Sequence, residues 1–226
     1  MSKNKRLAII PARIGSKRIK KKNIVNFLGK PLIWYAIDQV KKSKIYDKIH
    51  ISTDSQEIKR LSERSGVKVE FLREKRLADD KTTIDQVVKY VLKKFKNLGQ
   101  NYNEISLIYA TNPFIKKNFL TNGYKEYMKN KKKFSILSVN EIDYCIERSL
   151  KIENKLLKFQ YPQYANKRSN LFKKKYIDAG MFVIYQKDYF NKNSKKKFLP
   201  YILKSFDSVD INTHDDLAKA KKLFKR

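Results

Sequence analysis

One segment near the start of the chain constrains the fold more than any other, because a buried strand runs directly into a basic loop. Leu7 to Ile10 is an apolar run that predicts a buried strand, and Pro11 ends it. The loop from Arg13 to Lys22 holds one glycine and six basic residues. Such a loop at the carboxyl end of a strand is typical of open α/β sheets that bind phosphorylated ligands. Because the loop has neither the P-loop pattern nor G-x-G-x-x-G, phosphate binding would depend on backbone N–H groups and basic side chains.

Helix and strand signals alternate along the rest of the chain in the manner of βαβ units. Further strands are predicted at 49–52, 67–71, 105–109, 135–139, 180–185 and 209–211, and helices at 32–40, 54–65, 82–95, 119–128 and 213–224. Three polar pairs are predicted to form capping boxes: Asp54 with Glu57, Thr82 with Asp85, and Thr213 with Asp216. We expect one α/β domain over residues 1–226, with an open, mostly parallel sheet and helices on both faces.

The pattern loosens between residues 141 and 176, where short apolar pieces stand among polar residues. This segment is too poor in apolar residues to form an independent core. It is therefore expected to be an excursion within the single domain.

Composition limits the class of protein further. A length of 226 residues with 41% hydrophobic content suits one large α/β domain. No apolar stretch approaches the roughly 20 residues of a membrane span, and the run before Pro11 is too short for the core of a secretory signal. The single cysteine, Cys145, cannot form a disulfide within the chain, so we expect a cytoplasmic location and no membrane partner.

The net charge of +31 is compatible with nucleic-acid binding. However, only ten of the 53 basic residues are arginine, and the others are lysines scattered from end to end. The chain is also rich in Asn, Ile, Tyr and Phe, which an AT-rich genome favours. No zinc-finger spacing, RNP motif or repeat accompanies the charge. We expect no specific nucleic-acid partner, and we expect the charge to assist capture of anionic substrates.

The basic loop resembles the P-A-R-x-G-S-K-x-x-x-x-K-N signature of cytidylyltransferases that activate nonulosonic acids, the sialic-acid-like sugars. Matches recur in order at residues 52–54, 57–58, 71–73, 77–80 and 210–213. The segment 109–114, together with Arg168-Ser169 and the segment from Tyr176 to Phe182, is similar to the branch that acts on pseudaminic acid. The resemblance implies a Rossmann-like nucleotidyltransferase fold, in which the excursion of residues 141–176 pairs two chains into a homodimer.

The resemblance also implies the reaction: a nine-carbon 2-keto sugar acid attacks the α-phosphorus of CTP, giving a CMP-sugar and pyrophosphate. This requires phosphates held in line and stabilisation of charge. Arg13 and Lys22 are the expected catalytic contacts to the phosphates, together with Asp210. Arg18, Lys20 and Lys21 occupy positions that the signature leaves open, and we expect them to be solvated. The expected CTP-binding residues are Ala12, Arg13, Gly15, Ser16, Lys17, Lys22, Asn23, Arg73, Ala78 and Asp80.

Further residues match positions near the sugar in the family: Thr111, Asn112, Arg168, Ser169 and Asp178. The alternative for Arg73 is a surface ion pair. Helix capping fully explains Asp54, which we therefore leave out of the site.

Asp210 and Asn212 are the expected ligands of Mg²⁺ or Mn²⁺, since Mg²⁺ takes carboxylate and other oxygen ligands. The family carries Asp-x-Asp here, whereas this chain has Asn212, which is uncharged and cannot act as a base. Tight metal binding and full activity are therefore in question. The alternative for Asn212 is that it shapes the turn before Thr213.

The leading hypothesis is a CTP-dependent cytidylyltransferase for pseudaminic acid. N-acetylneuraminate, legionaminate or a deoxy-octulosonate are alternative substrates. Two hypotheses of other kinds remain: a basic nucleic-acid-binding protein, and a family member that binds nucleotide without turnover.

Overall fold

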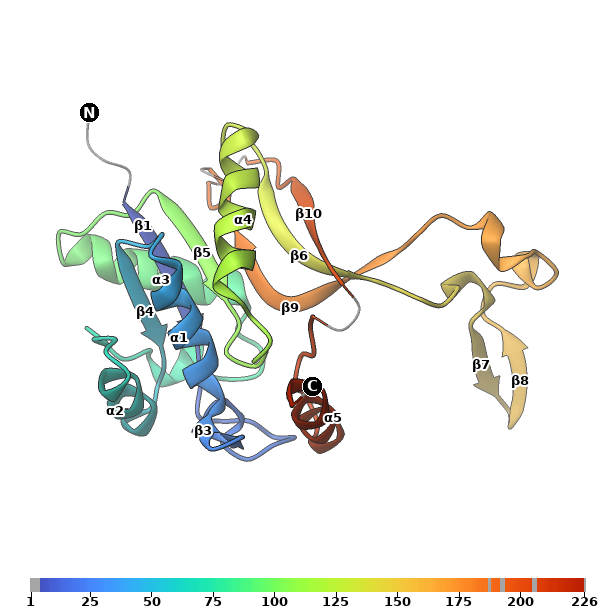
Figure 1. Ribbon diagram of the computed structural model, residues 1–226, viewed down its shortest axis with the longest axis horizontal. Coiled ribbons are helices and arrows are strands. Elements are labelled where there is room, and N and C mark those ends of the chain that lie inside the picture. The colour runs from blue at the N-terminus through green and yellow to red at the C-terminus, as the bar shows by residue number, and fades with distance from the viewer. Residues whose placement is uncertain (1–4, 187, 192–193, 205–206, 226) are drawn as a thin grey trace.

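A six-stranded sheet forms the centre of the computed structural model, which describes residues 5–186, 188–191, 194–204 and 207–225 (Figure 1). The strand order is β10–β6–β9–β5–β1–β4. The strands are β1 (Arg6–Pro11), β4 (Lys48–Ser52), β5 (Glu104–Ile108), β6 (Ser135–Glu141), β9 (Tyr176–Ile184) and β10 (Phe198–Leu203). Paired strands run parallel except at β9, which is antiparallel to both β5 and β6. The expected open, mostly parallel sheet is confirmed.

Helices cover both faces of this sheet, as expected. They are α1 (Leu32–Ser43), α2 (Gln56–Arg64), α3 (Ile84–Asn97), α4 (Lys117–Lys129) and α5 (His214–Phe224). Side chains of β1 alternate between two cores, because successive residues of a strand point to opposite faces. Ala8 and Ile10 pack in the core that includes α1 and α4, whereas Leu7 and Ile9 pack in the core that includes α3. Within the described residues, every helix is too short or too polar to cross a membrane.

Two helix starts differ from the prediction by one residue. The cap of α2 is Ser55, whose side chain accepts from the backbone of Ile58, and not Asp54. The capping box of α3 is formed by Thr83 and Gln86, not by Thr82 and Asp85. In both cases the polar residue before the true cap makes a different hydrogen bond: Asp54 accepts from Ile14, and Thr82 donates to Asp79. The predicted Thr213–Asp216 capping box of α5 is confirmed.

Two predicted strands do not join the sheet. Val67 and Val69 are buried as a strand would require, but residues 67–71 pair with no other strand. Residues 209–211 are also irregular, and Ile211 makes a single backbone hydrogen bond to Thr111 of 3.1 Å. Apolar runs of this length indicate burial without deciding whether a neighbouring strand is available. The strand β10 at 198–203 was not predicted.

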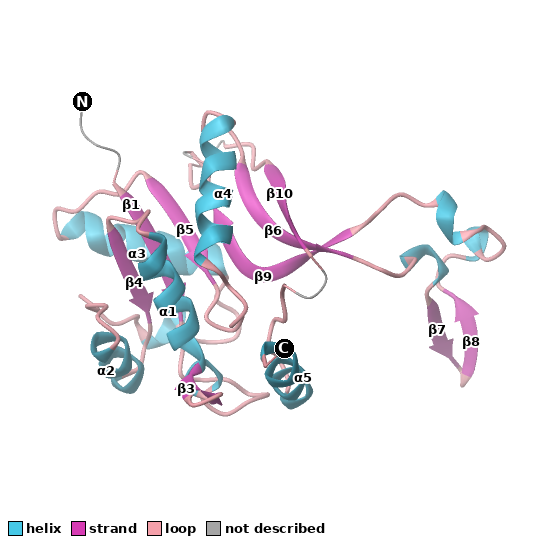
Figure 2. Ribbon diagram, in the orientation of Figure 1, coloured by secondary structure: helices cyan, strands magenta, loops and turns pink. Residues whose placement is uncertain are grey.

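The segment between β6 and β9 leaves the sheet as an arm (residues 142–175), which projects away from both cores in Figure 2. Its regular structure is a hairpin of β7 (Leu150–Glu153) and β8 (Leu156–Phe159) with short 3₁₀ turns. A second small hairpin, of β2 (Asn26–Phe27) and β3 (Lys30–Pro31), precedes α1. The arm covers most of the segment 141–176, and the expected role of that segment in pairing two chains stays a prediction.

His50 on β4 gives the core a sensitivity to acid. Its ring is 1% exposed and packs against Phe71 and Phe95. Burial, with repulsion from Lys48 and Arg73, lowers the pKa of His50 to about 3. An unfolded chain holds a histidine of pKa 6.5. Between these values the unfolded state binds one more proton than the folded state, so stability falls as pH falls.

We expect His50→Gln to remove this acid-dependent loss of stability, which amounts to up to about 1.4 kcal/mol per pH unit between pH 6.5 and 3. Urea unfolding measured from pH 7 down to pH 4.5 gives the slope for each protein. The matched control is His214→Gln, because His214 is exposed at the start of α5. The same slope in the parent and in His50→Gln would contradict the assignment.

Candidate functional site

A pocket of about 300 Å³ opens where β1, β4 and β5 end, on the carboxyl edge of the sheet. It brings together residues from five separate stretches of the chain. Its lining consists of Pro11, Arg13, Lys22, Asn23, Arg73, Leu77, Asp79, Asp80, Thr82, Ile84, Val87, Tyr109, Ala110, Thr111, Asp210 and Asn212. The fold therefore assembles all three of the expected catalytic residues, Arg13, Lys22 and Asp210, in one place.

The basic loop after β1 is fixed to its neighbours by main-chain contacts. The amide of the fully buried Ala12 donates to the carbonyl of Ser52 at 2.9 Å. The amide of Ile14 donates to Asp54 Oδ1 at 3.0 Å, and the side chain of Asn23 donates to the carbonyl of Arg13 at 2.8 Å. Asp54 thus anchors this loop and is not the helix cap. No local pattern could indicate that contact, because the partner lies 40 residues away.

Arg13 and Lys17 converge on the carboxylate of Asp80. Arg13 donates to Asp80 Oδ1 at 2.6 Å and to the carbonyl of Ala78 at 3.1 Å. Lys17 Nζ lies 2.5 Å from Asp80 Oδ2. Hydrogen bonds from Lys17 and Arg13 lower the pKa of Asp80, which therefore stays ionised at neutral pH. An incoming anion would compete with this carboxylate for both cations.

Arg73 is a buried part of the site and not a surface ion pair, since only 6% of it is exposed. Its side chain donates to the hydroxyl and the carbonyl of Ser52 and to the carbonyl of Leu77. Its own amide donates to the carbonyl of Thr53 at 2.7 Å. Burial lowers the pKa of Arg73 to about 10, which leaves the guanidinium charged at neutral pH.

Gly15 and Ser16 lie at the outer part of the loop and do not line the pocket. Gly15 is exposed, Ser16 is half-buried, and a Cβ added at Gly15 would meet no other protein atom within 4 Å. Their contribution to phosphate binding stays a prediction, through the backbone N–H groups of the loop.

Lys22, Asp210 and Asn212 form a connected group on the opposite side of the pocket. The Asn212 amide donates to Asp210 Oδ2 at 2.7 Å, and its oxygen accepts from Lys22 at 3.1 Å. Burial lowers the pKa of Lys22, partly offset by attraction from Asp210. The same Asn212 oxygen accepts from Arg18 Nη2 at 2.9 Å. Arg18, which we expected to be solvated, is exposed but is held against the site.

Gly180 leaves the space that Asp210 occupies. It lies in β9 with φ of +56°, and an added Cβ would stand 2.9 Å from Asp210 Cγ. Thr111 completes the support of this carboxylate, since its hydroxyl donates to Asp210 Oδ1 at 2.7 Å. Gly180 was not among the predicted site residues, because its importance is visible only once β9 and residue 210 lie together.

Thr111 lines the pocket, but Asn112 beside it does not. Asn112 is fully buried, and its amide donates to the carbonyl of Ala179 at 3.0 Å and to Ser208 Oγ at 2.8 Å. This geometry supports a role for Asn112 in positioning the chain around β9, and not one of touching a sugar.

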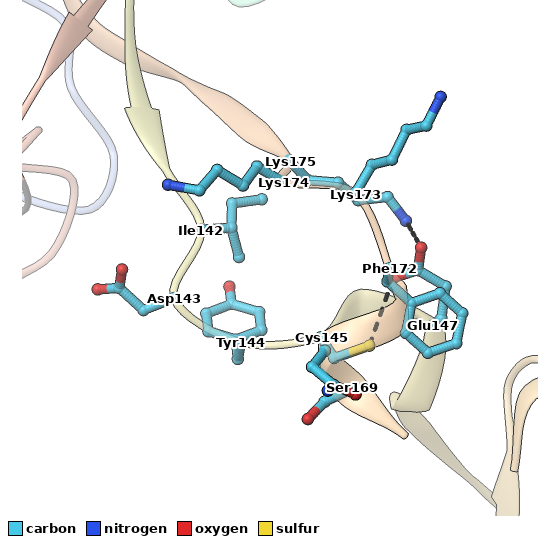
Figure 3. Close-up of a pocket in the computed structure, with 11 residues that line it drawn as sticks. Ile142, Asp143, Tyr144, Cys145, Glu147, Ser169, Phe172, Lys173, Lys174 and Lys175 are labelled. Atoms are coloured by element: carbon cyan, nitrogen blue, oxygen red, sulfur yellow. Dashed lines mark hydrogen bonds and ion pairs between the residues drawn. The ribbon is translucent and has the colours of Figure 1, made fainter. Parts of the chain in front are cut away.

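The remaining sugar-side candidates do not line this pocket. Ser169 lines a separate pocket of about 270 Å³ on the arm, with Cys145, Glu147 and Lys175 (Figure 3). Arg168 precedes it on the same arm. Asp178 lies on β9 and accepts from the amide of Gly180 at 2.8 Å. One chain therefore does not bring Arg168 and Ser169 together with Arg13 and Asp210.

The pocket that contains Arg13, Lys22 and Asp210 has side chains that suit a polyphosphate. Arginine binds phosphate oxygens in pairs and lysine acts as a point charge, and Arg13 and Lys22 both line this pocket. Cys145 and both histidines lie outside the lining of this pocket. The residues therefore favour binding and orientation of phosphates over covalent catalysis by cysteine or histidine.

Known proteins resemble this chain over nearly all of its length. Pseudaminic acid cytidylyltransferase of Campylobacter jejuni is 36% identical, over 98% of this chain and 97% of that protein. CMP-N,N'-diacetyllegionaminic acid synthase of Legionella pneumophila is 31% identical, over 96% and 95%. A solved CMP:2-keto-3-deoxy-manno-octonic acid synthetase complexed with CTP shares the fold, with a TM-score of 0.73 at 12% identity, covering 98% of this chain and 99% of that one.

Family membership follows from sequence as well as from fold. The family described as Cytidylyltransferase matches residues 7–215, a range that begins at β1 and ends in α5. That range includes the basic loop, the Arg73 segment and the Asp210–Asn212 pair. The chain belongs to the cytidylyltransferase family.

Proposed function

We propose that this chain activates pseudaminic acid with CTP, producing the CMP-sugar and pyrophosphate. The observation that carries the proposal is the pocket that Arg13, Lys22 and Asp210 line together at the carboxyl edge of the sheet. The identity to pseudaminic acid cytidylyltransferase over 98% of the chain supports the choice of sugar. The expected cytoplasmic location fits this proposal, because CTP is a cytoplasmic metabolite.

The reaction is a displacement at phosphorus. The anomeric hydroxyl oxygen of the sugar acid forms a bond to the α-phosphorus and releases its proton to solvent water. The bond from that phosphorus to the oxygen bridging the β-phosphate breaks, and pyrophosphate leaves. Arg13, Lys17 and Lys22 would hold the phosphates and offset the charge that develops on the leaving group. Arg13 and Lys17 become available when the triphosphate displaces Asp80.

The nucleoside would lie against the segment that Arg73 secures. Arg73 donates to the carbonyl of Leu77, and Arg13 donates to the carbonyl of Ala78. These contacts hold the 77–80 segment beside the loop, and this segment is our proposed contact for the cytosine base. Leu77 and Ile84 give this side of the pocket an apolar surface.

Asp210 is the carboxylate that we propose for a divalent metal, because Asp79 and Asp80, which also line the pocket, are engaged by Thr82 and by Arg13 and Lys17. Magnesium commonly binds one or two carboxylates together with substrate phosphates, and Asp210 offers one. Asn212 turns its oxygen toward Lys22 and Arg18, which leaves that oxygen engaged by cations. Among the described residues no group of three or more His, Cys, Asp or Glu side chains is placed to hold a metal. Asp210 would hold Mg²⁺ bound to the phosphates of CTP, where the ion offsets negative charge.

The arm is the proposed dimer contact. Its hairpin exposes Leu150, Ile152, Leu156 and Leu157, with Ile152 77% exposed. An isolated two-stranded hairpin is marginally stable in water, and large apolar surfaces on a protein mark interaction sites. A second copy of the chain would cover this surface. Arg168 and Ser169, which lie on the arm, would reach a sugar only in such an assembly.

We expect CTP with Mg²⁺ to raise the melting temperature more than ATP, GTP or UTP with Mg²⁺. A ligand that binds the native state stabilises it by mass action, by about 2.7 kcal/mol at a hundredfold excess over Kd. A pyrophosphate-release assay with CTP then compares pseudaminic, legionaminic and N-acetylneuraminic acids, and pseudaminic acid should give the highest kcat/KM. Equal thermal shifts with all four nucleotides would contradict the cytidine assignment, and a preference for another acid would contradict the sugar assignment.

We expect Arg13→Ala and Asp210→Ala each to lower kcat/KM on the order of 10²-fold, because each removes a charge that faces the reacting phosphates. Lys20→Ala is the matched control, since Lys20 is an exposed cation of the same loop that lies outside the pocket lining. Thermal unfolding checks that the variants remain folded. Near-parental turnover in both pocket variants would remove the phosphate assignment.

We expect a dimer in solution that depends on the apolar face of the hairpin. Ile152 and Leu157 form a cross-strand pair, and so do Lys151 and Lys158. The double variant Ile152→Asp with Leu157→Asp should sediment as a monomer, because charges on this face oppose burial. The control, Lys151→Asp with Lys158→Asp, places the same charges on the other face of the hairpin and should stay dimeric. A monomeric parent would refute the arm as a dimer contact.

A further inference from the structure

Arg18 makes a contact that has no assigned role in the proposed function. It belongs to the basic loop, yet its guanidinium reaches Asn212, which is 194 residues away in sequence. The contact of 2.9 Å joins the loop after β1 to the segment before α5. An exposed arginine would otherwise be free to extend into solvent, so this placement gives it a defined position at the rim of the pocket.

The amide of Asn212 is oriented by charges at both of its ends. Its oxygen accepts from Arg18 and from Lys22, while its nitrogen donates to Asp210. An amide has one accepting and one donating end, and here each end faces a group of the matching kind. In this orientation the Asn212 amide accepts from both cations and donates to the carboxylate, as the chemistry of each neighbour requires.

The local charge of this group is positive. Arg18, Lys22 and the nearby Arg13 contribute three positive charges, Asp210 and the nearby Asp216 contribute two negative charges, and Asn212 contributes none. Repulsion from Arg18 and Arg13 contributes to the lowered pKa of Lys22, although burial is the larger cause. A neutral amide accepts hydrogen bonds from both cations without cancelling their charge. The positive charges of Arg18 and Lys22 therefore remain available to attract an anion in the pocket.

We propose that Arg18 is a further triphosphate-binding residue, which transfers from Asn212 to a phosphate oxygen when CTP enters. The proposal rests on the proposed function. Arg18 and Lys22 together supply positive charge on the side of the pocket that has only one carboxylate for a metal. The protein therefore binds the triphosphate of CTP with a reduced requirement for divalent metal. Arginine suits this task because its planar group can bind two phosphate oxygens at once.

The test measures binding directly, by titration calorimetry with CTP and separately with inorganic tripolyphosphate. Each ligand is titrated in EDTA and in Mg²⁺. The proteins are the parent, Arg18→Gln, and Lys20→Gln, which removes a neighbouring exposed cation. In EDTA we expect Arg18→Gln to weaken binding of both ligands by at least about tenfold, as loss of a charged hydrogen bond commonly does. Lys20→Gln should change either Kd by less than about threefold.

A second variant tests the role of the neutral amide. Asn212→Asp adds a carboxylate that neutralises one of the two cations. We expect it to weaken binding of CTP in EDTA and to regain affinity in Mg²⁺, because a second carboxylate favours the metal. The dependence of Kd on Mg²⁺ should therefore be steeper in Asn212→Asp than in the parent.

The outcomes separate this proposal from the proposed function. Equal binding by Arg18→Gln and Lys20→Gln in EDTA, or no binding by the parent without metal, would overturn the role of Arg18. A loss of tripolyphosphate affinity in Arg18→Gln would support Arg18 even if the parent bound ATP as well as CTP. In that case the cytidine assignment alone would fail.

Discussion

The buried guanidinium of Arg73 is the contact on which the rest of the site depends. A charge that is only 6% exposed is costly unless it is hydrogen-bonded, and Arg73 meets this need through Ser52 and Leu77. Those contacts tie the end of β4 to the 77–80 segment. That segment in turn carries Ala78 and Asp80, the partners of Arg13. One buried cation therefore holds the 77–80 segment, which carries the partners of Arg13, against the end of β4.

The parts of the site that could be predicted are those that local sequence determines. The apolar run of β1 followed by a basic loop located Arg13 and Lys22, and a parallel sheet brings such strand ends together. All five helices were predicted near their observed positions. The true caps Ser55 and Thr83 were missed because Asp54 and Thr82, the neighbouring residues, are equally good caps by type. Three-dimensional contacts of Asp54 and Asp79 decide between them.

The parts that could not be predicted depend on residues far apart in the chain. No local pattern distinguishes Arg18, which reaches Asn212, from Lys20, which is exposed beside it. The segment at 209–211 has the composition of a strand but lies where only one backbone hydrogen bond to Thr111 is available. Arg168 lies on the arm and is not part of the pocket that Arg13 and Asp210 line, a separation that only the folded chain reveals.

Gly180 has a consequence for how this chain can change over generations. Every other amino acid that a single-nucleotide change can produce from a glycine codon carries a Cβ. At position 180 that atom would stand 2.9 Å from Asp210 Cγ, on a backbone whose φ is +56°. Even alanine would therefore have to displace the carboxylate or bend β9. As long as selection retains Asp210 in its present place, it also retains glycine at position 180. Glycine is retained there although it has no side chain that could contact a substrate.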